Sequence, residues 1–195
     1  MNLLIRNFLL FFLVFICFQG LSAQEVAIKT NALYWGTTTP NLSVEVALGP
    51  KSTIDLQGTY NPFSFKDNKK LKHWSVQPEY RLWNCEKFVG SFFGFHAHYA
   101  YYNVGGIKLP MDIFSSLRNY RYQGYAVGGG FSYGYQWFLG PHWNLEAEFG
   151  FGYTYAHFDK YNCHKCGDFL GKGHKHYFGP TKIGVSIVYL IKSKK

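Results

Sequence analysis

Residues 145–155 read LEAEFGFGYTY, with apolar side chains at every second position. The positions between them hold Glu146, Glu148, glycine and threonine. Residues 124–132, GYAVGGGFS, repeat the pattern with small residues at the even positions. A two-residue period is that of a β-strand, whose successive side chains point to opposite faces. These stretches therefore predict strands with one apolar face and one small or charged face.

The same period recurs along most of the chain and predicts eight strands. They cover residues 26–35, 41–48, 54–60, 73–83, 88–102, 124–132, 145–155 and 176–191. Short connections mostly alternate with long ones, as in outer-membrane barrels with short periplasmic turns and longer outside loops. Pro78 cannot donate a ladder hydrogen bond, so we expect a bulge at this position.

The composition also favours a membrane barrel. Aromatic residues make up 21% of the 195 residues, and charged residues make up 16%, against about 25% in a typical soluble protein. No internal stretch reaches the roughly 18 apolar residues of a membrane helix. The net charge is +9, but no basic helix or arginine-rich segment accompanies it, so we expect no nucleic-acid partner. The predicted fold is all-β, an eight-stranded antiparallel up-and-down transmembrane β-barrel of outer-membrane type.

The first residues resemble a secretory leader. Arg6 precedes an apolar core at residues 8–18, and Leu21-Ser22-Ala23 is a plausible cleavage site. We expect a signal peptide at residues 1–23 and a barrel domain at residues 24–195, located in the outer membrane. An uncleaved anchor helix is the alternative.

Packing volume decides which face of the strands lies inside. The interior of an eight-stranded barrel is only wide enough for side chains to fill, so the bulky apolar rows must point outward. A soluble barrel with an apolar interior is the less favoured alternative. The inward rows carry both charge signs, which predicts an ion-pair network that plugs the lumen. Its predicted members are Lys29, Glu45, Asp55, Glu79, Arg81, Glu146, Glu148 and Lys182.

Aromatic residues also gather near the expected strand ends. Those near the outer end are Tyr34, Tyr60, Trp74, Tyr101 and Tyr155, and those near the other end are Trp83, Trp137, Trp143 and Tyr189. Such girdles are typical of the two lipid–water interfaces of a membrane barrel.

Cysteines form the sharpest local motif. Cys163 and Cys166 lie in a long loop, where they could close a disulfide in an exported protein. With His174 and His176 they could instead form a zinc site, or they could remain free thiols. Apart from this zinc alternative, no cofactor is expected. Cys85 lies in a predicted turn at the opposite end and is expected to be unpaired.

No catalytic constellation emerges from the sequence. His96 and His98 are expected to face the lumen, bonded to water or tyrosine, with the glutamates several layers below them. His157 has no serine two residues away, the pairing that an outer-membrane lipid-modifying enzyme would use. We therefore predict no enzyme, with an enzyme acting on lipid A and a narrow pore as alternatives.

The predicted outer loops are basic. Their cations include Lys66, Lys69, Lys70, Lys72, Arg118, Arg121, Lys172 and Lys175. Lysines near an anionic membrane surface contribute about 1 kcal/mol each, so these loops are suited to lipopolysaccharide phosphates. Ordinary solvated loop charge is the alternative. We expect a monomer with a structural or surface-interaction role, whose partner is outer-membrane lipid or a protein.

Several motifs point to a family. They are Lys29-Thr30-Asn31, Thr38-Thr39-Pro40-Asn41, Tyr60-Asn61-Pro62-Phe63-Ser64-Phe65, Tyr120-Arg121-Tyr122, Cys163-His164-Lys165-Cys166-Gly167 and His176-Tyr177-Phe178-Gly179-Pro180-Thr181-Lys182. With them the chain resembles a family of uncharacterised Bacteroidetes outer-membrane proteins, a domain of unknown function. The resemblance spans most of the mature chain and implies an outer-membrane barrel, in some cases an accessory of surface appendages. It implies no catalytic residues.

Overall fold

A computed structural model describes residues 25–63, 70–106, 120–162 and 167–191. The predicted signal peptide, residues 1–23, lies outside these ranges. No helix in the described part of the chain is long and apolar enough to cross a membrane.

Eight antiparallel strands form the structure, each hydrogen-bonded to its neighbours in the chain. They are β1 (Val26–Asn31), β2 (Asn41–Ala47), β3 (Ser52–Asn61), β4 (Lys70–Trp83), β5 (Gly90–Gly105), β6 (Tyr120–Phe138), β7 (Trp143–Asn162) and β8 (Phe169–Ile191). Pairing of β1 with β8, from Val26↔Ile191 to Asn31↔Ser186, closes the barrel. The predicted all-β ring of eight antiparallel strands is therefore confirmed.

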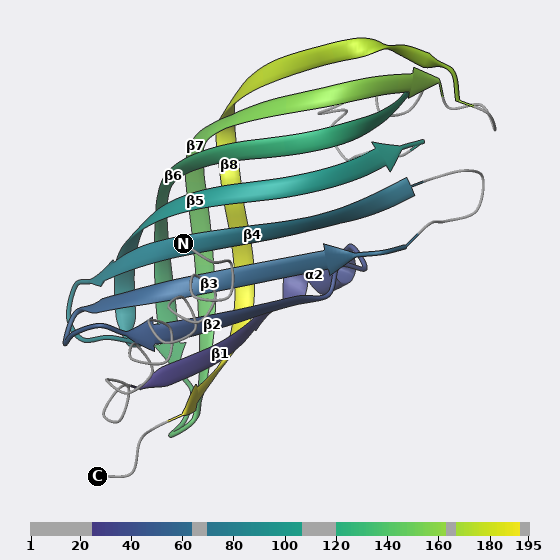
Figure 1. The fold of residues 1–195 in the computed structure, drawn as a ribbon. Helices are drawn as coiled ribbons and strands as arrows, with labels where there is room; N and C mark the ends of the chain where they lie inside the picture. Colours follow the sequence, from purple (N-terminus) through teal and green to yellow (C-terminus); the bar gives the residue numbers. More distant parts are fainter. Residues whose placement is uncertain (1–24, 64–69, 107–119, 163–166, 192–195) are drawn as a thin grey trace, which may run out of the picture.

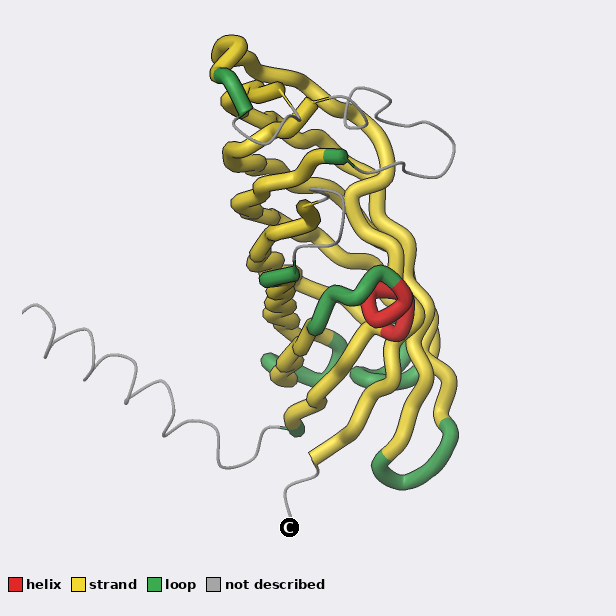
Figure 2. The backbone as a smooth tube through the Cα atoms, turned by 90° about the vertical axis from the view of Figure 1, so that its right-hand side faces the viewer, coloured by secondary structure: helices red, strands yellow, loops and turns green. Residues whose placement is uncertain are grey.

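The strands lengthen steadily along the chain, from six residues in β1 to 23 in β8. The start of β1 and the end of β8 lie at the same end of the barrel as the short turns (Figure 1). From that end, β5–β8 continue well past the helix α2 (Ala32–Gly36), which lies about halfway up the molecule (Figure 2). The barrel is thus complete at one end and one-sided at the other.

The helix α2 corrects the sequence prediction, which continued the first strand to residue 35. Asn31 ends β1 and caps the helix, because its Oδ1 accepts from Leu33 N at 3.0 Å. The same amide bonds the edge of β8, donating from Nδ2 to Ile183 O at 3.1 Å and accepting from Val185 N at 3.3 Å. Where β1 ends, the buried Asn31 side chain therefore makes the hydrogen bonds to β8 that a continued β1 would have made.

Asn31→Ala is expected to destabilise the barrel by about 2 kcal/mol, because it removes a helix cap and leaves polar groups at the β8 edge unpaired. Denaturant unfolding of the purified protein in detergent, followed by tryptophan fluorescence, measures the change. Thr37→Ala is the control, since the Thr37 side chain lies in an exposed turn. Equal stability of Asn31→Ala and the wild type would contradict this role.

The predicted bulge at Pro78 is wrong. Pro78 pairs with Leu56 in β3, and the β4–β5 register is the same on both sides of it. Gln77 and Pro78 have no ladder partner in β5, but no extra residue is inserted, so the strand is not bulged. A register shift lies instead between Gly150 and Phe151 in the β7–β8 ladder, where Pro180 faces Phe151. Bulges increase the local bend and twist of a sheet.

Glycines allow β6 and β7 to approach closely near this bend. Gly130 pairs with Gly152. A Cβ on either residue would lie 2.7 Å from the Cα of the other. Backbone cannot move aside as a flexible side chain can, so this crossing requires glycine on both strands.

Candidate functional site

The inward faces of the strands gather a cluster of charged side chains at mid-barrel. All eight residues of the predicted network lie here, each at most 7% exposed: Lys29, Glu45, Asp55, Glu79, Arg81, Glu146, Glu148 and Lys182. They come from β1, β2, β3, β4, β7 and β8. Because successive side chains alternate between faces, each strand contributes its charges to the lumen and its apolar residues to the outside. We call this cluster the lumen network.

Arg81 is the centre of the lumen network. Its Nε donates to Glu79 Oε1 at 2.7 Å, and its Nη2 donates to Glu148 Oε2 at 2.9 Å. Its Nη1 donates to Glu45 Oε2 at 3.0 Å and to Glu146 Oε2 at 2.9 Å. The planar guanidinium thus ties carboxylates from three strands, β2, β4 and β7, together, which a lysine could not do with the same geometry.

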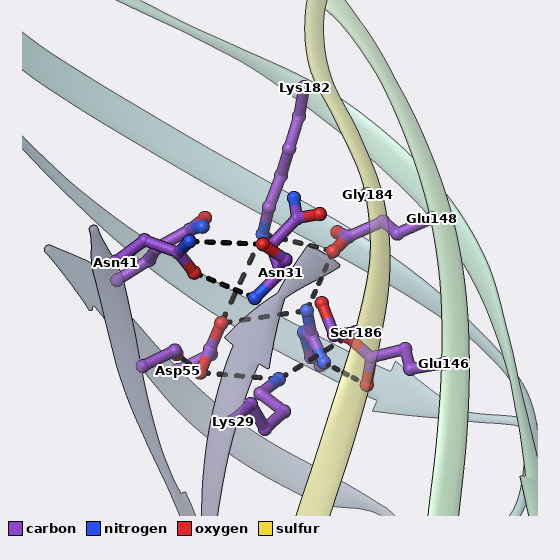
Figure 3. A pocket seen from close by; sticks show the side chains of 12 residues that line it. Lys29, Asn31, Asn41, Asp55, Glu146, Glu148, Lys182, Gly184 and Ser186 are labelled. Carbon is purple, nitrogen blue, oxygen red and sulfur yellow. Dashed lines mark hydrogen bonds and ion pairs between the residues drawn. The ribbon is translucent and has the colours of Figure 1, made fainter. Parts of the chain in front are cut away.

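The two lysines flank this centre. Lys29 Nζ lies 2.7 Å from Glu45 Oε2, 3.3 Å from Asp55 Oδ1 and 3.4 Å from Glu146 Oε1. On the other side, Lys182 Nζ lies 2.5 Å from Glu79 Oε2, 3.1 Å from Glu148 Oε2 and 4.0 Å from Asp55 Oδ2. Figure 3 shows the two lysines converging with Asp55, Glu146 and Glu148 from opposite walls. Lys29 thereby links β1 to β2, β3 and β7 through the interior, and Lys182 links β8 to β3, β4 and β7.

Neutral side chains add hydrogen bonds to four of the five carboxylates, whereas Oε1 of Glu148 is buried without a hydrogen-bond partner. Ser43 donates to Asp55, and Thr53 donates to Glu45. Ser132 Oγ donates to Glu79 Oε1 at 3.2 Å, and Gln136 Nε2 donates to Glu146 Oε2 at 3.2 Å. The sequence pattern did not single out these partners, although all of them occupy inward positions of their strands. Buried charges are tolerated only with such additional hydrogen bonds.

Little open space remains within the lumen network. The cavity among its side chains has a volume of about 10 Å³, enough for about one water molecule. Toward the short turns, the lumen is filled by buried apolar residues. They are Ala27, Ala47, Trp83, Phe88, Phe92, Val188 and Leu190. Arg81 joins the two layers, because its guanidinium carbon lies 4.2 Å from the centre of the Phe92 ring.

Trp83 belongs to this apolar plug and not to a girdle, contrary to the sequence expectation. It is 3% exposed, and its Nε1 donates to Thr53 Oγ1 at 2.9 Å. Phe88 adopts a positive φ of 62° in the β4–β5 turn and is buried with it. Tyr34, placed in the outer girdle by the sequence, is instead a half-buried residue of α2.

His96 and His98 lie on the inward face of β5, at the end of the lumen network away from the short turns. His96 Nε2 is 2.8 Å from Thr181 Oγ1, and His98 Nε2 is 2.9 Å from Thr154 Oγ1. Both histidines thus bond threonine, where water or tyrosine was expected. Glu79 pairs with His96 across the strands, so the expected separation of several layers is wrong for Glu79. It holds for Glu146 and Glu148, because the strand registers place His96 level with Gly152 of β7. The reason is the turn before β5, which spans residues 84–89 and places His96 level with Glu79.

The predicted disulfide or zinc motif falls largely outside the described residues, because these end at 162 and resume at 167. Of its members, His174 and His176 are described, on the outward face of β8. Their ring centres lie 5.7 Å apart, and His176 Nδ1 is 2.5 Å from Tyr153 Oη. No group of three or more His, Cys, Asp or Glu that could hold a metal occurs among the described residues, which exclude Cys163 and Cys166. Cys85 is exposed and free.

The predicted basic residues do not form one cluster. Lys66, Lys69 and Arg118 lie outside the described ranges. Lys70 and Lys72 belong to β4, Arg121 belongs to β6, and Lys172 and Lys175 belong to β8. These five described residues lie toward the end of the barrel that is far from the short turns. Basic character is therefore spread around this end.

The outward face of the barrel is apolar all round. In the described part of the chain, 39 large hydrophobic side chains are exposed, whereas seven hydrophobic residues are buried. Exposed patches on soluble monomers seldom exceed a few hundred Å². On β7 the outward-facing positions are apolar or aromatic from Trp143 to Tyr155. Further along the same face, away from the short turns, they are His157 and Asp159. The usual distribution of polarity is thus inverted, with apolar side chains on the exterior and charged side chains in the interior.

These features define the class of protein: a closed eight-stranded antiparallel barrel with an ionic interior and an apolar exterior. The chain belongs to the family described as "Protein of unknown function (DUF3575)", whose model matches residues 8–191. The predicted membership of a domain-of-unknown-function family is thereby confirmed. No curated protein and no solved structure matches the chain.

Proposed function

We propose that this protein is a small, monomeric outer-membrane barrel with a closed lumen, which acts by presenting its basic outer end to lipopolysaccharide or to a protein partner. The observation that carries the proposal is the inversion of polarity, with apolar side chains exposed around the whole ring and the charges buried at its centre. Membrane barrels need an apolar band facing lipid and can keep a polar interior.

The height of the apolar band supports a membrane location. Residues 143–155 of β7, at about 3.3 Å per residue and a tilt of about 45°, span about 30 Å, close to the hydrocarbon thickness of a bilayer. Outward-facing aromatic residues lie at both limits of the band. Those at the far limit are Tyr60, Trp74, Tyr101 and Tyr155, and those near the short turns are Trp137, Trp143 and Tyr189.

The filled interior argues against transport. The lumen network leaves space for about one water molecule, and the apolar plug closes the end beyond it. A structural or surface-interaction role, rather than a general porin or an enzyme, therefore agrees best with the geometry. The outer loops and the projecting parts of β5–β8 are the surfaces that such a role would use.

Cell fractionation tests the location. We expect the full chain in the outer-membrane fraction, and we expect its electrophoretic mobility in SDS to change on boiling, because a barrel that resists SDS migrates differently when heated. The matched sample is the same protein refolded without detergent. Recovery of a dispersed, folded protein from plain buffer would contradict the proposal.

Planar-bilayer recording tests the closed lumen. Wild-type protein inserted at known density is expected to give no discrete conductance steps, because the charged cluster fills the cross-section. A general porin measured under the same conditions is the positive control. Regular steps from the wild type would favour the narrow-pore alternative.

Unchanged lipid A mass spectra in cells carrying His96→Ala, His98→Ala and His157→Ala together would disfavour the enzyme alternative.

A further inference from the structure

An apolar groove lies on the outward face of the barrel, between α2 and strands β2–β4. Its volume is about 500 Å³. The residues that shape it are Trp35, Leu42, Gly58, Tyr60, Trp74 and Val76. It lies at the far limit of the apolar band, where Tyr60 pairs with Trp74. We call it the outer groove.

Gly58 is the reason that the outer groove exists. It pairs with Leu42 on one side and with Val76 on the other, in a row of outward-facing positions. A Cβ on Gly58 would meet nothing closer than Leu42 O at 3.9 Å. The missing side chain therefore leaves a depression between two exposed apolar residues, and the backbone there does not itself require glycine.

The walls of the outer groove are held in place by neighbouring contacts. Trp35 Nε1 donates to Thr30 Oγ1 at 2.8 Å, which fixes the indole above the strands. On the other wall, the Trp74 ring lies 5.5 Å from the Tyr99 ring. A preformed, mostly apolar depression is typical of a ligand site.

Positive charge lies directly beyond the groove. Lys72 is two residues from Trp74 on the same face of β4, and Lys70 follows on that face. Within the described ranges, no carboxylate lies at ion-pair distance from either lysine. An apolar groove next to unpaired cations is complementary to an acyl chain that ends in a phosphate-bearing head group.

We propose that the outer groove binds one acyl chain of lipid A, with Lys72 and Lys70 contacting its phosphate. The inference rests on the proposed membrane location, because the groove and the lysines lie at the barrel end away from the short turns. In an outer-membrane barrel this end meets the outer leaflet. The site therefore assigns the lipopolysaccharide contact to one face of the barrel, over β2–β4.

Native mass spectrometry of the full chain in detergent, with added lipid A, tests the site. The wild type is expected to retain one lipid A molecule. Gly58→Phe fills the groove from its floor and is expected to reduce retention at least tenfold. Ala147→Phe adds the same ring to the outward face of β7, on the opposite side of the ring, and is expected to retain lipid A as the wild type does.

The charge requirement has its own pair of variants. Lys72→Gln is expected to lower the affinity for lipid A about fivefold, because a lysine at an anionic surface contributes about that factor. Lys51→Gln, in the exposed β2–β3 turn at the opposite end of the barrel, is the matched control and is expected to leave the affinity unchanged. Phosphatidylglycerol and phosphatidylcholine serve as competing lipids. Retention of phosphatidylglycerol equal to that of lipid A would overturn the assignment to lipid A.

Two outcomes separate the site from the proposed function. If the wild type enters the outer membrane but Gly58→Phe still retains lipid A, the groove assignment is wrong and the barrel proposal stands. If the wild type is recovered from plain buffer as a folded soluble protein, the membrane proposal fails, and the lipid assignment fails with it. Folding of each variant is checked by its heat-dependent mobility.

Discussion

Arg81→Met is expected to destabilise the folded barrel by about 3–5 kcal/mol, the usual cost of removing one partner from a buried charge cluster. The change removes four charged hydrogen bonds and leaves five carboxylates facing Lys29 and Lys182. Methionine fills a similar volume, so the loss reports charge and bonding more than packing. Denaturant unfolding in detergent, followed by tryptophan fluorescence, measures the free energy.

Two further variants make this result specific. Arg121→Met makes the same substitution at a site where the guanidinium carbon lies 4.6 Å from the Tyr161 ring centre, and it is expected to cost about 0.5–1 kcal/mol. Arg81→Lys keeps the charge but lacks the planar fork, so its stability should lie between those of the wild type and Arg81→Met. An Arg81→Met barrel as stable as Arg121→Met would show that the lumen network does not hold the strands together.

Gly130→Val is expected to prevent formation of the barrel or to destabilise it by about 3 kcal/mol or more. The new Cβ would overlap the backbone of Phe151 and Gly152, so β6 and β7 would have to separate. Valine has a higher strand propensity than glycine, so a loss of stability in Gly130→Val could not be attributed to propensity. The fraction of protein that shows heat-dependent mobility after refolding into detergent measures the effect.

Gly58→Val is the matched control for this prediction. It adds the same side chain to an outward-facing strand position with open space, and valine is better suited to a strand than glycine. We expect normal yield and stability from Gly58→Val. Folding of Gly130→Val with wild-type yield would mean that the close crossing of β6 and β7 is not needed for closure.

The strand pattern and the interior charges were predictable because both follow from alternation. In β7, Glu146 and Glu148 share one face while Phe149 and Phe151 share the other, and a narrow interior excludes the second face. Each strand could therefore be oriented independently, without knowledge of its neighbours. This is why the members of the lumen network could be listed before their mutual contacts were known.

Features that depend on pairing between strands were not predictable. The helix α2 follows from the contacts of Asn31 with β8, which lies at the other end of the chain. The level of His96 depends on the length of the preceding turn, and the bulge near Pro180 depends on the match between β7 and β8. Trp83 lies at the end of its strand, and its burial follows from the turn that buries Phe88 beside it.

Pairing of β1 with β8 has a consequence for how the chain assembles. The first strand to be synthesised finds its second partner only when the last one is available, so a nascent chain carries an unsatisfied edge throughout synthesis. Bringing the two ends of the chain together has an entropic cost that comes before the contacts of this seam form. Non-local contacts of this kind make folding slow. Until then the unfinished edge can pair with other chains, and the six-residue seam is the expected last step of folding.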